Sequence, residues 1–229
     1  MYNLSSSALL EVDVQNDFCP DGALAVKNGN EVIEPLNKLA GLFASRGGIV
    51  IATQDWHCKN HISFASSHPG KSPGDVISLP MVKEQILWPD HCVQGSFGAE
   101  FHKDLDLDPV NLIIRKGYRH DLDSYSAFLE NDGFTETGLE GFLRGLYQNK
   151  NKDRDKKEEV VINTVFIGGL ATDYCVRYSA MDSIMAGFKT YVIEDAIRGV
   201  GNPKGSIEEA IETLKYWGVT FIKTGDLFV

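Results

Sequence analysis

Short apolar segments alternate with longer amphipathic ones along most of this chain. Three longer segments, residues 30–45, 173–186 and 206–216, carry apolar side chains at helical spacing. Strands that are apolar on both faces and separated by helices are typical of a parallel sheet covered on both sides. The pattern therefore predicts a three-layer α/β/α fold with a mainly parallel six-stranded sheet. The segments expected to form strands are residues 8–14, 49–53, 111–114, part of 160–170, 190–193 and 219–222.

Length and composition fit one domain. The 229 residues, 43% of them hydrophobic, are enough for one large α/β core and too few for two, so we expect a single domain over residues 1–229. The formal net charge of −10 argues against a nucleic-acid partner, because neutralising phosphates needs clustered Lys and Arg. An acidic surface of this kind is ordinary for a soluble enzyme.

Targeting signals are not visible. Residues 1–7 lack the basic start and apolar stretch of a secretory signal, and no apolar run approaches the ~20 residues that a membrane span needs. We therefore expect a cytoplasmic protein without a membrane partner. The cysteines form no CxxC motif and are expected to be free thiols in a reducing compartment. They are Cys19, Cys58, Cys92 and Cys175.

Two stretches interrupt the alternation. Residues 60–94 are rich in Pro, Gly and Ser and carry His61, His68 and His91. A connection of that length in a compact domain is usually functional or disordered. Residues 148–159 form a charge run with nothing to bury, which indicates a solvated loop insertion, and the sequence assigns it no function.

Chemically reactive side chains come where the predicted strands end. Asp13 ends the first strand, Asp55 follows the second, and Lys116 follows the third. The small residues before Cys175 follow the fourth. In open parallel sheets, ligands bind beyond the carboxyl ends of the strands. The coincidence indicates an enzyme.

Cys175 is the candidate nucleophile. The segment IGGLATDYCV passes from a strand through small residues into a helix, which places Cys175 in the first helical turn. Free N–H groups and the helix dipole stabilise a thiolate there. The N–H groups of Ala171 and Cys175 could also hold an oxyanion. The competing interpretation is a small buried thiol, which is the usual fate of cysteine.

Asp13 and Lys116 are candidates to act on that thiol. A carboxylate at Asp13 could deprotonate the thiol and later protonate a leaving amine. The alternative is a cap or turn residue, a position for which Asp17 is better placed. A Lys116 ammonium between Asp13 and Cys175 would favour the ionised form of both, although taken alone it would be a surface lysine.

A second group of residues has the chemistry of a metal site. Asp55 and His57 in TQDWHCKNH are two residues apart at a strand end, so both can point to one face. His91 from the long loop would complete a set that suits Zn, Mn or Fe(II), and His61 is a possible fourth ligand or a neighbour of the ligands. Aromatic residues near these segments could wall a flat pocket or belong to the core. They are Phe18, Trp88, Tyr125 and Tyr174.

Five motifs together resemble the nicotinamidases of the isochorismatase-like cysteine hydrolase superfamily: DVQNDFCPDGALAV, TQDWHCKNHISFAS, WPDHCVQGSFGAE, RKGYRHDLDSYSAF and GGLATDYCV. The resemblance implies nicotinamide as substrate, a role in NAD salvage and a thioester on the cysteine. It also implies one divalent metal ion, with zinc favoured over manganese or iron, a cis Leu170–Ala171 peptide and a homo-oligomer. The implied site comprises a triad of Asp13, Lys116 and Cys175, metal ligands Asp55, His57 and His91, and a substrate pocket of Phe18, Trp88, Tyr125 and Tyr174.

Three other functions remain open at this point. Another amidase of the superfamily would act on a carbamoyl or ureido substrate, and such relatives generally lack the DWH metal residues. Two histidines and a carboxylate also make the facial triad of an Fe(II) oxygenase, but that leaves Asp13, Lys116 and Cys175 unexplained. A non-enzymatic metal- or nicotinamide-binding protein would have no need of a reactive thiol.

Overall fold

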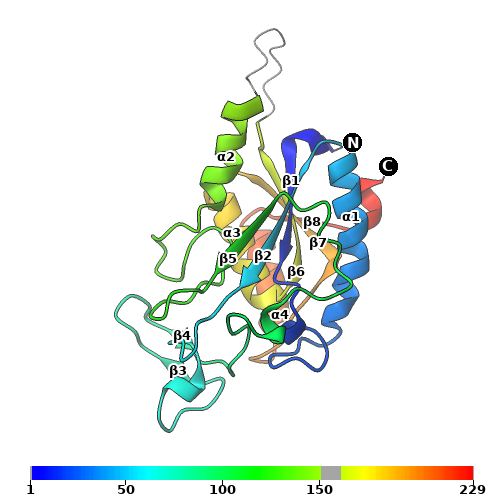
Figure 1. Ribbon diagram of the computed structural model, residues 1–229. Helices are drawn as coiled ribbons and strands as arrows, with labels where there is room; N and C mark the ends of the chain where they lie inside the picture. Colours follow the sequence, from blue (N-terminus) through cyan, green and yellow to red (C-terminus); the bar gives the residue numbers. More distant parts are fainter. Residues whose placement is uncertain (1, 151–160, 229) are drawn as a thin grey trace.

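Six parallel strands form the sheet that organises the molecule (Figure 1), in the order β5-β2-β1-β6-β7-β8. The computed structural model describes residues 2–150 and 161–228. The parallel six-stranded sheet predicted from the apolar segments is confirmed. Its strands are β1 (Ser7–Val12), β2 (Ile49–Asp55), β5 (Leu112–Lys116), β6 (Thr164–Leu170), β7 (Lys189–Arg198) and β8 (Thr220–Ile222).

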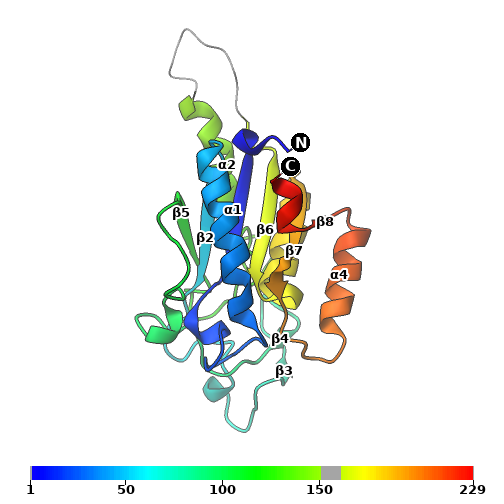
Figure 2. The ribbon, with the colours of Figure 1, turned by 90° about the vertical axis from the view of Figure 1, so that its right-hand side faces the viewer.

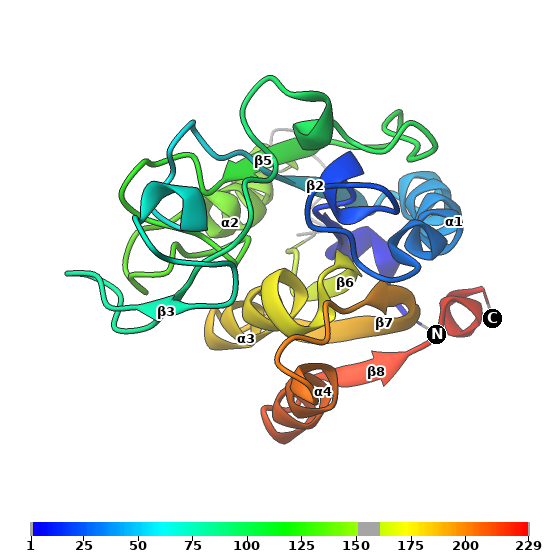
Figure 3. The same cartoon turned by 90° about the horizontal axis from the view of Figure 1, so that it is seen from below.

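Helices cover both faces of the sheet, as Figures 2 and 3 show. Helix α1 (Ile33–Ser45) packs on one face, whereas α2 (Leu139–Lys150), α3 (Arg177–Met185) and α4 (Ser206–Tyr216) lie on the other. The face of α1 that meets the sheet follows directly from its helical spacing, and each such buried aliphatic or aromatic side chain stabilises the fold by about 1.5–3 kcal/mol. It consists of Ile33, Leu36, Leu39, Ala40 and Phe43.

The central strands are buried on both faces, which explains their continuous apolar runs. Every residue of β1 and β2 is buried. Leu9 belongs to the core beneath α1, and its neighbour Leu10 belongs to the core on the opposite face. The sheet is therefore the rigid middle layer, and it holds the polar residues at its carboxyl edge in fixed positions.

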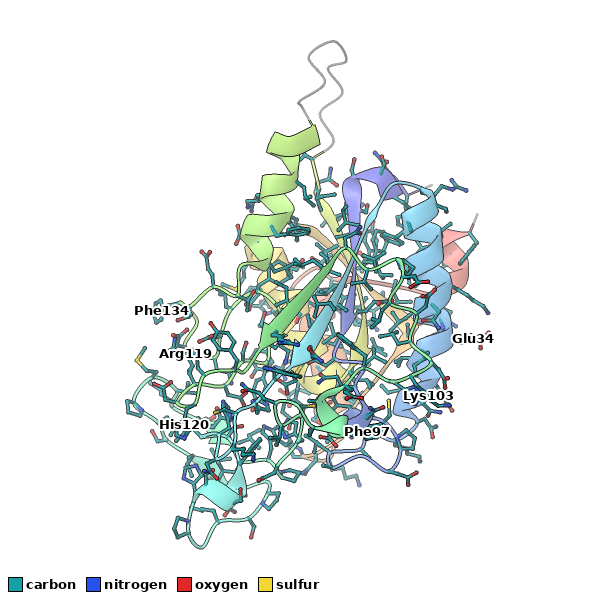
Figure 4. All side chains as sticks on the ribbon, in the orientation of Figure 1. Glu34, Phe97, Lys103, Arg119, His120 and Phe134 are labelled. Atoms are coloured by element: carbon teal, nitrogen blue, oxygen red, sulfur yellow. The ribbon has the colours of Figure 1, made fainter. Side chains whose placement is uncertain are left out.

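The long segment 60–94 is ordered and lies at the lower end of the molecule in Figure 1. It contains a small antiparallel hairpin of β3 (Val76–Ile77) and β4 (Gln85–Ile86). The segment around Arg119 and His120, labelled in Figure 4, lies beside this end, where the His120 carbonyl accepts a hydrogen bond from the N–H of Ile62. The two loops therefore meet at the carboxyl edge.

Single turns make up the remaining regular structure. The turn that carries Cys175 is π-helical, η6 (Thr172–Val176), and only then does α3 begin. A continuous α-helix from residue 173 is therefore wrong at its first turn. The 3₁₀ turns are η1 (Leu4–Ser6), η2 (Asn16–Phe18), η3 (Gly29–Val32), η4 (Ala65–Ser67), η5 (Phe97–Ala99) and η7 (Thr224–Leu227).

The first residues of the predicted charged loop are helical instead. Residues 148–150 belong to the last turn of α2, because the polar residues there continue a helix whose apolar side is already buried. The rest of the predicted loop, residues 151–159, lies outside the described residues. Within the described part of the chain, every helix is too short or too polar to cross a membrane.

Glu11 is an unusual residue for the middle of a buried strand. Its side chain is fully buried in β1, and neither carboxyl oxygen has a hydrogen-bond partner among the described residues. Its direct neighbours on the adjacent strands are the small residues Ala52 and Gly168. Burial, with a smaller contribution from Asp106, raises the pKa of Glu11 from 4.5 to about 8. The folded state therefore favours the protonated acid.

We expect Glu11→Gln to remove a pH dependence of stability. Because the folded pKa lies above the unfolded one, the wild-type free energy of unfolding falls as pH rises from about 4.5 to about 8, by up to roughly 5 kcal/mol. Urea unfolding at pH 5 and pH 8 measures this fall. The fall should be much smaller in Glu11→Gln and unchanged in Glu208→Gln, which alters an exposed residue of α4. Equal falls in wild type and Glu11→Gln would contradict the prediction.

Candidate active site

The ammonium group of Lys116 is the centre of a buried polar cluster at the carboxyl edge of the sheet. Lys116 ends β5, and its Nζ lies 2.9 Å from Oδ2 of Asp13 and 3.2 Å from Oδ1 of Asp55. It also donates to the Ser124 carbonyl at 3.0 Å. Burial alone would lower the pKa of Lys116, but the two carboxylates hold it well above its ordinary value. The lysine therefore stays charged and joins the ends of three strands.

Asp13 directly follows β1, and a residue of β2 holds it in place. Its backbone is left-handed, with φ of 48°. The N–H of Asp13 donates to Oγ1 of Thr53 at 3.0 Å, and the Thr53 hydroxyl donates back to Oδ1 of Asp13 at 2.6 Å. Burial raises the pKa of Asp13, while Lys116 and the Thr53 hydroxyl act in the opposite direction. The result is a carboxylate more basic than an exposed aspartate.

Cys175 lies in the turn η6, between β6 and α3. Its Sγ is 3.3 Å from Nζ of Lys116, and its thiol is a hydrogen-bonding neighbour of the Asp13 carboxyl group. Burial raises the pKa of the thiol well above its ordinary value, and Lys116 offsets this only in part. The resting group is therefore the neutral thiol. A position in the first helical turn favours the thiolate, but burial outweighs that effect. A base must remove its proton before it can attack.

Asp173 fixes the loop that faces the Cys175 turn. Its buried carboxylate accepts hydrogen bonds from the N–H groups of Val200 and Gly201, both at 2.9 Å, and from the Ser206 hydroxyl at 2.6 Å. Val200 lines the same pocket as Cys175. The position of the pocket wall is therefore tied to the turn that carries the thiol.

Asp55, His57 and His91 bring three possible metal ligands within 4.8 Å of one another. Nε2 of His57 lies 3.0 Å, and Nε2 of His91 3.4 Å, from Oδ2 of Asp55. The Nδ1 atoms of the two rings lie 2.8 Å from the carbonyls of Gly117 and Pro89. Because a carbonyl only accepts hydrogen bonds, it holds the proton on Nδ1 and leaves Nε2 free for a metal. The donor set suits zinc, manganese or Fe(II).

Electrostatics at this cluster favour a cation. Burial alone would raise the pKa of Asp55, but His57 and Lys116 hold it well below its ordinary value, so the carboxylate stays ionised. Burial alone would lower the pKa of His57, but the Asp55 carboxylate raises it to about 8. The charge that attracts a proton to His57 would equally attract a metal ion.

His61 lies next to the three ligands rather than among them. Its ring centroid is 4.3 Å from that of His57, and its two nitrogens contact the Ser63 hydroxyl at 2.7 Å and the Leu122 carbonyl at 3.2 Å. Together with His57 and Asp123 it forms a second group with possible ligand atoms. A ligand role for His61 stays a prediction.

A small, largely apolar pocket is lined by both the thiol and the metal-site histidines. Such a lining, with a few polar groups converging on it, is typical of small-molecule sites. Trp88, Tyr125 and Tyr174 make edge-to-face contacts with centroids 4.8–6.4 Å apart, and Nε1 of Trp88 donates to the Tyr125 hydroxyl at 3.0 Å. Phe18 packs edge-on against the His91 ring. Aromatic rings therefore make up much of the pocket wall.

The structure brings the predicted site residues together. Asp13 and Lys116 contact the thiol, and the ring of His61 lies beside that of His57 at a tilt of 37°. The Leu170–Ala171 peptide is cis, as the resemblance implies. The other predicted residues all line the pocket: Phe18, Asp55, His57, Trp88, His91, Tyr125, Ala171, Tyr174 and Cys175.

Sequence reasoning misses several residues of the site. Thr53 precedes Asp55 by two positions on one strand, so it shares a face with a residue already singled out. Asp123 is an acidic residue in the loop after Lys116, a weaker signal. The apolar residues Leu24 and Val200 also line the pocket, and nothing in their loop sequences distinguishes them. Phe97 and Phe134, labelled in Figure 4, lie at the periphery and are exposed.

Known proteins match the chain over its length. It is 44% identical to a nicotinamidase from Acinetobacter baylyi, over all of this chain and 98% of that protein. A solved nicotinamidase/pyrazinamidase from Acinetobacter baumanii superposes with a TM-score of 0.86 at 47% identity, covering 97% of this chain and 98% of the other. A pyrazinamidase of Pyrococcus horikoshii, solved in complex with zinc, gives 0.72 at 35% identity, covering 95% and 99%.

A family model supports the same relationship. The model for the isochorismatase domain matches residues 7–226, which include the whole sheet and every residue of the site. The chain therefore belongs to the isochorismatase family.

Proposed function

We propose that this protein is a nicotinamidase, which hydrolyses nicotinamide to nicotinate and ammonia in NAD salvage. The observation that carries the proposal is a single aromatic pocket lined by a buried thiol and by a three-ligand metal cluster. A pyridine carboxamide can use both, because its carboxamide requires a nucleophile and its ring nitrogen is a metal ligand. The relatives named nicotinamidase support the same activity.

The first half-reaction transfers the acyl group to sulfur. Asp13 takes the proton of the Cys175 thiol as Sγ attacks the carboxamide carbon. Backbone N–H groups of Ala171 and Cys175 receive the negative charge that develops on oxygen, and one such donor typically contributes about 3–4 kcal/mol. Asp13 then gives its proton to the nitrogen, the C–N bond breaks, and ammonia leaves a thioester on Cys175.

The second half-reaction restores the enzyme. Asp13, again a carboxylate, takes a proton from water as the water oxygen attacks the thioester carbon. The C–S bond breaks, the proton returns from Asp13 to sulfur, and nicotinic acid leaves and ionises to nicotinate in water. Lys116 keeps its charge throughout and stabilises the negative charge that passes between the carboxylate and the thiolate.

Asp55, His57 and His91 are the residues that would hold a metal ion, which we propose to be zinc. The ion would supply Lewis acidity that attracts a pyridine nitrogen. The zinc complex of the Pyrococcus relative supports this choice of metal. Aromatic side chains of Phe18, Trp88, Tyr125 and Tyr174 would then pack against the substrate ring.

The cellular setting completes the proposal. We propose a cytoplasmic enzyme that works as one domain over residues 1–229 and assembles as a homo-oligomer. The family match over residues 7–226 supports the single domain.

Ammonia release from nicotinamide, before and after metal removal, tests the proposed function. We expect release by the metal-loaded protein, loss after complete chelation, and recovery when zinc is restored. A coupled ammonia assay measures all three. Release that persists after complete chelation would contradict the role of the metal, and no release with metal bound would contradict nicotinamide as the substrate.

Removing the nucleophile should separate binding from turnover. We expect Cys175→Ala to reduce kcat at least about 10³-fold, because no other group can form the thioester. Metal content and nicotinamide binding, measured by calorimetry, should persist. The control is Cys19→Ala, which shortens a buried core thiol outside the pocket and should keep its activity. Substantial turnover by Cys175→Ala would rule out covalent catalysis.

Histidine substitutions should distinguish the metal ligands from other histidines. We expect His57→Ala to lose bound metal and ammonia release together, because it removes one of three ligands. His68→Ala is the matched control, since Nε2 of His68 contacts only the Ile62 carbonyl among the described residues, at 2.7 Å. Elemental analysis of the purified variants gives the metal content. Full metal occupancy in His57→Ala would contradict the assignment.

A further inference from the structure

The two carboxyl oxygens of Asp13 have different partners. Oδ2 forms the 2.9 Å ion pair with Lys116, whose Nζ also lies 3.3 Å from Sγ of Cys175. Oδ1 accepts the 2.6 Å hydrogen bond from the hydroxyl of Thr53. Thr53 is fully buried in the middle layer of the molecule, so its side chain has no solvent to turn toward. One carboxyl oxygen is therefore held by Thr53, and the other is paired with the lysine that contacts the thiol.

The hydrogen bonds between the two residues are reciprocal. Oγ1 of Thr53 accepts from the backbone N–H of Asp13 at 3.0 Å, and the same hydroxyl donates to the carboxylate at 2.6 Å. The first bond fixes the orientation of the hydroxyl, because its acceptor side is already occupied. The second bond then fixes the rotation of the carboxyl group. One side chain thus sets both the left-handed backbone of Asp13 and the direction of its acid group.

We propose that Thr53 is a positioning residue for the general base, holding Oδ1 of Asp13 so that Oδ2 alone carries the proton in both half-reactions. The proposal rests on the proposed function for its reaction. Thr53 does not touch the substrate in this mechanism. It acts through Asp13, by keeping one oxygen in line with the thiol and the leaving nitrogen.

The need for such a residue follows from the chemistry. Asp13 must accept a proton from sulfur, deliver it to nitrogen, and then repeat the exchange with water and sulfur. If the carboxyl group rotated, either its protonated or its deprotonated oxygen could face the reacting atom. Misplacing a catalytic group lowers the reaction rate strongly. A hydroxyl donor also favours the carboxylate, which is the form that acts as base.

The interpretation of a pH–rate profile depends on the other charged and titratable groups around Asp13. Lys116 faces it from β5, Asp55 from β2 and Cys175 from η6. Substitution of Thr53 leaves these groups in place. A change in the acid limb of a pH profile therefore reports the lost hydroxyl rather than a lost charge.

Thr53→Val and Thr53→Ser form the central comparison. Valine keeps the shape and removes the hydroxyl, so we expect kcat for nicotinamide to fall about 10–100-fold with KM little changed. We also expect the acid limb of kcat/KM to move up by about one pH unit, because the carboxylate loses a stabilising donor. Serine keeps the hydroxyl and should restore both. If Thr53→Val does not fold, Thr53→Ala takes its place.

A matched control is a second buried threonine. Thr190 lies in β7, where its Oγ1 contacts Ser183 and the Phe188 carbonyl away from the site. Thr190→Val removes a buried hydroxyl of the same kind and should leave the acid limb unchanged. Circular dichroism and metal content, measured for every variant, show that the fold and the metal site are retained.

Alkylation of Cys175 by iodoacetamide separates this proposal from the proposed function. Its rate against pH, followed by mass spectrometry of the modified peptide, needs no nicotinamide. We expect its acid limb to move up in Thr53→Val and to return in Thr53→Ser. Unchanged limbs in both assays, or a kcat loss that Thr53→Ser shares, would overturn the positioning role. If the wild-type protein released no ammonia, the proposed function would fail, and the alkylation profiles would still decide the role of Thr53.

Discussion

A buried ammonium held between two buried carboxylates determines the geometry of the whole carboxyl edge of the sheet. Lys116 ends β5, Asp55 ends β2, and the strand register places the two residues side by side. Asp13 reaches the same ammonium from β1. Removing one partner of such a cluster leaves an uncompensated buried charge, which is far more costly than the pair is stabilising. The chemistry of the site therefore depends on the order of the strands, because only neighbouring parallel strands bring these three ends together.

Asp55 extends that constraint to the metal cluster. Its Oδ1 faces Lys116, while its Oδ2 faces the Nε2 atoms of His57 and His91. One carboxylate thus belongs both to the group that breaks the amide bond and to the group that would hold the substrate ring. Because each oxygen is already committed, Asp55 cannot rotate to improve one contact without losing the other. The spacing between thiol and metal ligands is consequently set by a single side chain on a rigid strand.

The sheet could be predicted because its central strands are apolar on both faces, and the triad because each member follows a strand. The π-helical turn at Cys175 could not, since small residues before a helix are compatible with either geometry. Thr53 and Asp173 were hidden for a different reason. Their hydrogen bonds join residues 40 and 27–33 positions away in the chain, and no local pattern records such contacts. The neutral state of the Cys175 thiol likewise depends on burial, which opposes the effect of the helix terminus and of Lys116.

Glu11 and Asp13 show why partners matter more than burial in making a base. Both are carboxylic acids of the same chain segment, two residues apart, and both are fully buried. Burial raises both pKa values. Glu11 has no hydrogen-bond partner among the described residues, so the folded state favours its protonated form. Its only effect is to lower the free energy of unfolding as pH rises. Asp13 has the Lys116 ammonium and the Thr53 hydroxyl, which pull its pKa back down without removing the basicity that burial provides. A buried carboxyl group with a raised pKa, whose ionised form is stabilised by an ammonium and a hydroxyl, is the kind of base that a neutral thiol requires.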